Sequence, residues 1–211
     1  MSEPGGALAT PLGVLDWRRR VHAIYAEARA NGDPCAAHEH WRAARDELFA
    51  SHPASPIPAR ERNRFGGLNY APYDPALRFT LAVDTDVPPQ RWEVDTATDG
   101  LVPFELAGAL HVPGVGDLAV WWLDSYGGGI FVPIKDASAP ARSYGGGRYL
   151  IDTVKGADLG GDVRDGELVV DLNFAYNPSC AYSPAWTCPL ATAANTVPVE
   201  VDAGELVGPG S

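Results

Sequence analysis

The chain has 211 residues, 45% of them hydrophobic and 20% charged, which is typical of a globular protein with its own hydrophobic core. Its formal net charge is −11 and the basic stretches at 18–20 and 60–64 are short, so nucleic acid is not an expected partner. Because no apolar run approaches the ~20 residues of a membrane span and the N-terminus does not resemble a secretory signal, we expect no membrane partner and a cytoplasmic location.

Two helices are predicted near the N-terminus. Residues 1–12 contain Gly, Pro and Ser without periodicity, and we expect a disordered arm there. Apolar residues then recur at helical spacing until an Asn-Gly pair ends the pattern. An Asp-Pro pair follows, and it offers a cap and a first-turn proline for a second helix. We therefore predict a helical hairpin with its connector over residues 13–58.

The rest of the chain is predicted to form strands, because the apolar period changes from about 3.6 residues to 2 after Pro75. The predicted strands cover residues 77–83, 90–94, 104–112, 117–124, 130–135, 148–154, 167–174 and 196–201. Short, turn-rich connections between them are typical of antiparallel meanders. The predicted fold class is mainly β (α+β), with an antiparallel β-barrel or sandwich-like meander over residues 59–205 after the helical hairpin, and a tail over 206–211.

The segment 144–190 contains the densest group of unusual residues. Three consecutive glycines precede Arg148, and they indicate a turn, a bulge or the close approach of a ligand. An inward Arg148 would pair with Asp152 or Asp171, or it would receive a small anion. Asp171 and Asn173 are predicted on one face of a strand. We expect these residues either to be structural or to line a pocket for an unknown small molecule, with Arg148 receiving an anionic group. The predicted ligand-binding residues are Tyr144, Arg148, Asp171, Asn173, Tyr176 and Asn177.

Cys180 and Cys188 lie in a proline-rich loop, separated by seven residues. Four interpretations remain open: inert buried thiols, a locally closed disulfide, half of a metal site, or a reactive cysteine that acts as a nucleophile or redox thiol. Zinc typically binds closer cysteine pairs and needs four ligands, and no histidine follows His111, so we expect no metal and no cofactor. Cys180 and Cys188 are therefore the candidate catalytic residues if the protein is an enzyme.

Several segments together resemble a known family. They read HWRAARDELFASHPASPIP, FGGLNYAPYDP, YGGGRYLIDT, DLNFAYNPSCAY, CPLATAANTVPV and AGE. The chain is thereby similar to the domain of unknown function 1684 family of prokaryotic proteins. Pro140 and Ala141 stand where relatives tend to have Gly and Glu, so the hairpin there is expected to differ. The resemblance implies a shared location, without an activity, for Arg148, Asp171, Asn173, Tyr176, Asn177, Cys180 and Cys188.

Three functions follow from these observations as alternatives. The first is the binding of a small molecule by the β domain, and the second is an enzyme that uses Cys180 or Cys188. The third is a structural or interaction domain without a ligand, in which the polar residues of 144–190 only hold a long loop in place.

Overall fold

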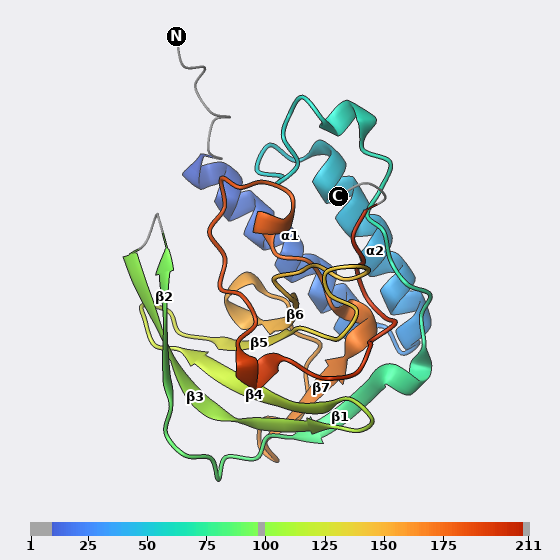
Figure 1. Ribbon diagram of the computed structural model, residues 1–211. Coiled ribbons are helices and arrows are strands. Elements are labelled where there is room, and N and C mark those ends of the chain that lie inside the picture. The colour runs from blue at the N-terminus through green and yellow to red at the C-terminus, as the bar shows by residue number, and fades with distance from the viewer. Residues whose placement is uncertain (1–9, 97–99, 209–211) are drawn as a thin grey trace.

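The structure is a computed structural model that describes residues 10–96 and 100–208, with two helices followed by seven strands (Figure 1). Most of the predicted arm at 1–12 and half of the predicted tail at 206–211 lie outside the described residues.

The predicted helical hairpin is present. Helix α1 spans Pro11–Ala30 and helix α2 spans Pro34–Ser51. Each begins at a proline behind a capping side chain: Thr10 Oγ1 accepts a hydrogen bond from Gly13 N at 3.1 Å, and Asp33 Oδ1 accepts one from Cys35 N at 2.9 Å. Because Thr10 provides this cap, α1 begins inside the segment that was predicted to be an arm.

The strands form two antiparallel sheets, which confirms the α+β class. The larger sheet contains, in the order of the chain, β2 (Arg91–Thr96), β3 (Gly100–Val112), β4 (Gly116–Leu123), β5 (Ile130–Ile134) and β6 (Arg148–Asp152). The smaller sheet pairs β1 (Arg78–Ala82) with β7 (Glu167–Asp171).

The larger sheet is open, so the prediction of a barrel is wrong. Within 10–96 and 100–208, strands β2 and β6 occupy its two edges and do not pair with each other. A closed barrel fills its interior with side chains from its own strands. Here the two helices and the C-terminal segments lie on one side of the curved sheet and supply that packing (Figure 1).

Three predicted strands end early or do not form, for identifiable reasons. Strand β6 ends because Asp152 caps the 3₁₀ turn Thr153–Lys155, and β7 ends because Asp171 caps the 3₁₀ turn Leu172–Phe174. The predicted strand at 196–201 forms only a parallel bridge, Lys135 to Thr196, and then bends at Pro198 and Val199.

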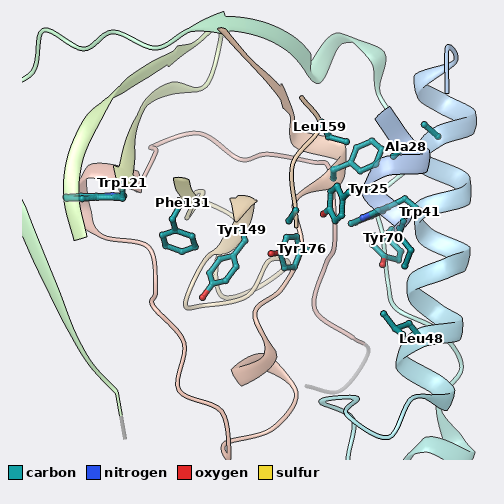
Figure 2. Packing of buried hydrophobic residues seen from close by; sticks show 14 of the residues in the cluster. Tyr25, Ala28, Trp41, Leu48, Tyr70, Trp121, Phe131, Tyr149, Leu159 and Tyr176 are labelled. Atoms are coloured by element: carbon teal, nitrogen blue, oxygen red, sulfur yellow. The ribbon is translucent and has the colours of Figure 1, made fainter. Parts of the chain in front are cut away.

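A row of aromatic side chains connects the sheet to the helices (Figure 2). Phe131 and Tyr149 have ring centroids 4.7 Å apart, and Tyr149 and Tyr176 follow at 5.6 Å. Tyr25 of α1 and Trp41 of α2 meet edge to face at 6.3 Å in the same buried cluster. Such pairs contribute about 0.5–1.5 kcal/mol each beyond area burial. The helical hairpin and the larger sheet therefore share one hydrophobic core.

Candidate functional site

Two cavities flank residues 178–190, which we call the cysteine loop. One cavity, of about 310 Å³, is lined by Cys188 and its neighbours, and we call it the thiol pocket. The other, of about 590 Å³, is lined by Asn177, Tyr182 and Glu205, and we call it the Glu205 cavity. The loop that carries both candidate thiols is thus a wall of both cavities.

The thiol pocket is mostly apolar. Strands β2 to β5, helix α1 and the cysteine loop contribute its apolar side chains: Val14, Trp17, Val94, Val102, Phe104, Leu123, Phe131 and Trp186. Its charged side chains are Arg18, Asp152 and Lys155. Apolar walls with a few convergent polar groups are characteristic of small-molecule sites.

Lys155 owes its position to the 3₁₀ turn that follows β6. Its Nζ lies 3.0 Å from Asp152 Oδ2 and 5.3 Å from the ring centroid of Tyr149, while about half of the side chain remains exposed. Burial disfavours the ammonium, but the charge and the hydrogen bond of Asp152 together raise the pKa of Lys155. Lys155 is therefore a cation at the wall of an apolar cavity.

The two thiols of the cysteine loop are unequal. The neighbouring thiol of Cys180 lowers the pKa of Cys188 against the effect of burial, and the backbone N–H of Cys180 and the charge of Lys155 act in the same direction. The neighbouring thiol of Cys188, together with burial, raises the pKa of Cys180. Tyr144 Oη lies 3.7 Å from Cys180 Sγ. Cys188 is thus the more acidic thiol, and it lines the pocket.

Both cysteines are free, so the structure does not contain the disulfide that the sequence left open.

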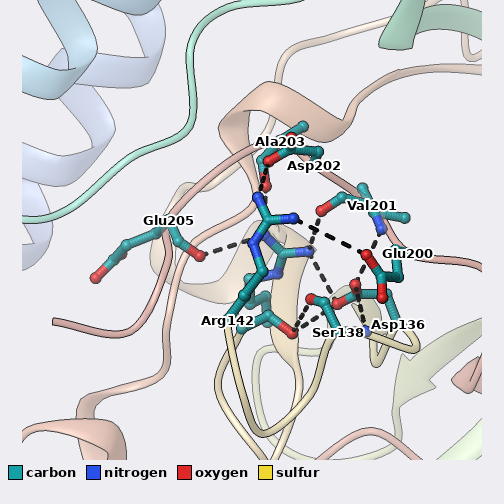
Figure 3. Close-up of polar contacts among 10 residues, drawn as sticks. Asp136, Ser138, Arg142, Glu200, Val201, Asp202, Ala203 and Glu205 are labelled. Carbon is teal, nitrogen blue, oxygen red and sulfur yellow. Dashed lines mark hydrogen bonds and ion pairs between the residues drawn. The ribbon is translucent and has the colours of Figure 1, made fainter. Parts of the chain in front are cut away.

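Arg148 is wholly buried at the start of β6 and bonds to the protein itself. Its Nη2 lies 3.1 Å from Asp136 Oδ1, so its partner is neither Asp152 nor Asp171, the two candidates from the sequence. The guanidinium also donates to the backbone carbonyls of Val201, Ala203 and Glu205, in the region shown in Figure 3. Gly147 lies directly before Arg148. A Cβ at this position would lie 2.9 Å from the carbonyl oxygen of Ile134 in β5, so the last of the three glycines lets the backbone pass close to β5.

Asp171 and Asn173 do lie together, although not through strand alternation. Asn173 donates from its backbone N and its Nδ2 to Asp171 Oδ1, at 3.0 and 2.8 Å. Arg78 Nη1 lies 3.0 Å from Asp171 Oδ2. The Asn173 amide also exchanges two 2.8 Å hydrogen bonds with the backbone of Asp74. This pair ties the end of β7 to the segment before β1.

Tyr144 and Asn177 line the Glu205 cavity, and Tyr176 is buried behind it. Asn177 donates from its backbone N and its Nδ2 to the Glu205 carboxylate, at 3.0 and 3.2 Å. Arg45 Nη2 lies 2.8 Å from the same carboxylate. Burial raises the pKa of Glu205 to about 7, although Arg45 opposes the shift.

Comparison with known proteins identifies the family. The model of a family described as protein of unknown function (DUF1684) matches residues 63–206. The chain belongs to the DUF1684 family. It is similar to the solution NMR structure of an uncharacterised protein from Haloarcula marismortui, with 29% sequence identity and a TM-score of 0.56, over 94% of this chain and 98% of that one. A search of curated proteins gave no match.

The segment that matches DUF1684 contains Lys155, Cys188 and Glu205, whereas the part of the thiol pocket that α1 builds lies before it. Of the predicted residues, the structure brings together Asp171 with Asn173, Tyr144 with Asn177, and Cys180 with Cys188. Arg148 meets Asn177 only through Glu205, whose carbonyl accepts from Arg148 and whose carboxylate accepts from Asn177. A ligand-binding role for any of them stays a prediction.

Sequence reasoning missed four charged residues: Arg45, Asp136, Lys155 and Glu205. Glu205 had a signal, because it lies in an Ala-Gly-Glu segment that matches the family, but Lys155 sits in a turn without a motif. The described residues contain no group of three or more His, Cys, Asp or Glu that could hold a metal ion. Among the described helices, none is long and apolar enough to cross a membrane.

Proposed function

We propose that this protein binds a small, largely apolar molecule with one acidic group in the thiol pocket. The observation that carries the proposal is a cavity of about 310 Å³ whose walls are aromatic and aliphatic and whose edge holds the cation Lys155. Pockets of this size and composition are the usual sites for small ligands. Phe104, Phe131 and Trp186 would cover the apolar part of the ligand.

Lys155 and Arg18 would attract the acidic group. Together they outnumber the single carboxylate of Asp152 in the pocket wall. A charge pair that forms beside apolar walls is less screened than one on the open surface. Arg148, in contrast, already has Asp136 and three backbone carbonyls as partners. We therefore assign to Lys155 the anion-binding role that the sequence suggested for Arg148.

The Glu205 cavity is larger but suits an acidic ligand less well. The Glu205 carboxylate lies in its wall, and the donors around it, Arg45, Asn177 and Tyr182, already bind that carboxylate. An anion placed there would meet a carboxyl group whose neighbouring donors are already used.

The test uses 8-anilinonaphthalene-1-sulfonate (ANS), a fluorescent probe that joins aromatic rings to a sulfonate. We expect saturable binding to the folded protein and an affinity about fivefold to tenfold lower for Lys155→Met, which corresponds to a charge-assisted contact of about 1 kcal/mol. Lys155→Arg should restore most of the affinity. Arg164→Met removes an exposed cation outside the pocket and is the matched control. Equal loss in the Lys155 and Arg164 variants, or no saturable binding by the wild type, would rule out the proposal.

We place the protein in the cytosol and expect neither nucleic acid nor a membrane as its partner. Three free thiols suit a reducing compartment, and the net charge of −11 disfavours binding to phosphate backbones.

A further inference from the structure

We propose that Cys188 and Cys180 form a dithiol site that reduces a small organic hydroperoxide bound in the thiol pocket, with Cys188 as the nucleophile and Cys180 as the resolving thiol. The inference rests on the proposed function, because the same pocket would hold the substrate.

The surroundings of Cys188 are those of a reactive thiol. It lines the pocket, and its neighbours are the thiol and backbone N–H of Cys180 and the ammonium of Lys155. Reactive cysteines lie in such electropositive, partly exposed places, because the thiolate is the attacking species. Both cysteines are partly buried, so substrate would reach Cys188 through the pocket.

The two thiols differ in the way that the two roles require. Cys180 and Lys155 lower the pKa of Cys188, which favours its thiolate near neutral pH. Cys180 keeps its proton, since the neighbouring thiol of Cys188 and burial raise its pKa. Tyr144 Oη lies 3.7 Å from Cys180 Sγ, on the side of the Glu205 cavity.

The reaction balances with these groups. The Cys188 thiolate attacks the terminal oxygen of the hydroperoxide, the O–O bond breaks, and the alkoxide leaves and takes a proton from Lys155 or from water. The products are a Cys188 sulfenic acid and an alcohol. The Cys180 sulfur then attacks Cys188, and its proton leaves with the hydroxyl group as water. Two thiols lose two electrons and the peroxide gains two, and a low-molecular-weight thiol would reduce the resulting disulfide.

The walls of the pocket indicate the class of substrate. Aromatic side chains from β3, β5 and the cysteine loop surround the approach to Cys188, so an organic group on the peroxide gains contact area that hydrogen peroxide lacks. Cys188 lies in a stretch, 182–190, that contains neither helix nor strand, and Cys180 lies in the short 3₁₀ turn Ser179–Ala181.

The experiment treats the reduced full chain with one equivalent of cumene hydroperoxide and follows the intact mass and each thiol. We expect the wild type to form a Cys180–Cys188 disulfide, and Cys188 to oxidise at least about tenfold faster than the exposed Cys35, because the surroundings of Cys188 favour its thiolate. Cys180→Ser should stop at a sulfenic acid that dimedone traps. Cys188→Ser should lose the fast reaction, and Cys35→Ser should behave as the wild type.

Oxidation of Cys188 and Cys35 at equal rates would overturn the inference. A disulfide that forms with a small disulfide reagent but not with the hydroperoxide would overturn the substrate class. ANS binding, measured on the wild type and on Cys188→Ser, separates this inference from the proposed function. A wild type that binds ANS but shows no fast oxidation of Cys188 contradicts the dithiol site alone. A wild type that does not bind ANS contradicts the pocket itself.

Discussion

Strand β6 carries an ion pair at each end, and the two pairs have almost the same length but different surroundings. At its first residue, Arg148 lies 3.1 Å from Asp136, and the two side chains are 0% and 1% exposed. At its last residue, Asp152 lies 3.0 Å from Lys155, whose side chain is 47% exposed. Distance therefore does not distinguish the two pairs, and burial does.

Burial determines what each pair can do. The Arg148 guanidinium is bound by a carboxylate and three carbonyls, and a ligand would have to displace protein groups to reach it. The Lys155 ammonium borders a cavity and can turn towards a ligand. We therefore expect changes at Arg148 to lower stability and changes at the thiol pocket to lower binding.

The largest effect on stability should come from Arg148→Met. This change removes the cation from the buried carboxylate of Asp136, which keeps hydrogen bonds only from Ser143 and from the backbone N–H groups of Ser138 and Val201. The loss of one member of a buried pair typically costs about 3–5 kcal/mol. Urea denaturation should show this decrease in the free energy of unfolding. The ANS affinity of the molecules that remain folded should not change.

Arg142→Met is the matched control, because Arg142 pairs with Asp202 in the same region but is about half exposed (Figure 3). It should change stability by less than about 1 kcal/mol. Equal destabilisation by the two substitutions would show that burial does not set the difference between the pairs.

An intermediate effect is expected at Glu205, and it depends on pH. Burial raises the pKa of Glu205 from 4.5 to about 7, so between these values the folded protein holds a proton that the unfolded chain has released. The free energy of unfolding should therefore fall as pH rises through this range, by on the order of 3 kcal/mol relative to Glu205→Gln. Thermal or urea unfolding at several pH values measures this slope.

The slope, and not the absolute stability, is the informative quantity, since Glu205→Gln also removes the charge that faces Arg45. Parallel pH profiles for the wild type and the variant would contradict the raised pKa.

The smallest effect on stability should come from Trp186→Ala. Trp186 is only partly buried in the wall of the thiol pocket, so its loss should change the free energy of unfolding by about 1 kcal/mol or less. The affinity for ANS should fall about tenfold, because the ring covers the apolar part of the ligand. Fluorescence titration and urea denaturation of the same sample distinguish the two quantities. A large loss of stability with unchanged affinity would make Trp186 a structural residue.

The sequence predicted the local features of the fold well. Periodicity located both helices, the Asp33-Pro34 pair located the start of the second, and alternation located most strands, whereas the Thr10 cap lies in the segment that was predicted to be an arm. It could not predict that the sheet stays open, because a barrel, a sandwich and an open sheet share the same alternation. The ends of β6 and β7 depend on Asp152 and Asp171 side chains that cap turns, which alternation does not reveal.

The candidate site was predictable only in part. The cysteine loop was recognised from its composition. Asp171 and Asn173 were expected on one face of a strand, and they lie together through a 3₁₀ turn instead. The partner of Arg148 was not predictable, because Asp136 lies in a loop after β5 and is brought to Arg148 only by the fold. Lys155 carried no sequence signal, since its importance comes from the cavity that distant segments build around it.

A ¹H–¹⁵N NMR titration with ANS would show which end of β6 faces a ligand. We predict saturable shifts of the backbone signals of Val94, Phe131, Lys155 and Cys188, with little change at Asp136 and Arg148. Shifts concentrated at Asp136, Arg148 and residues 200–205 would contradict the assignment of the thiol pocket as the ligand site.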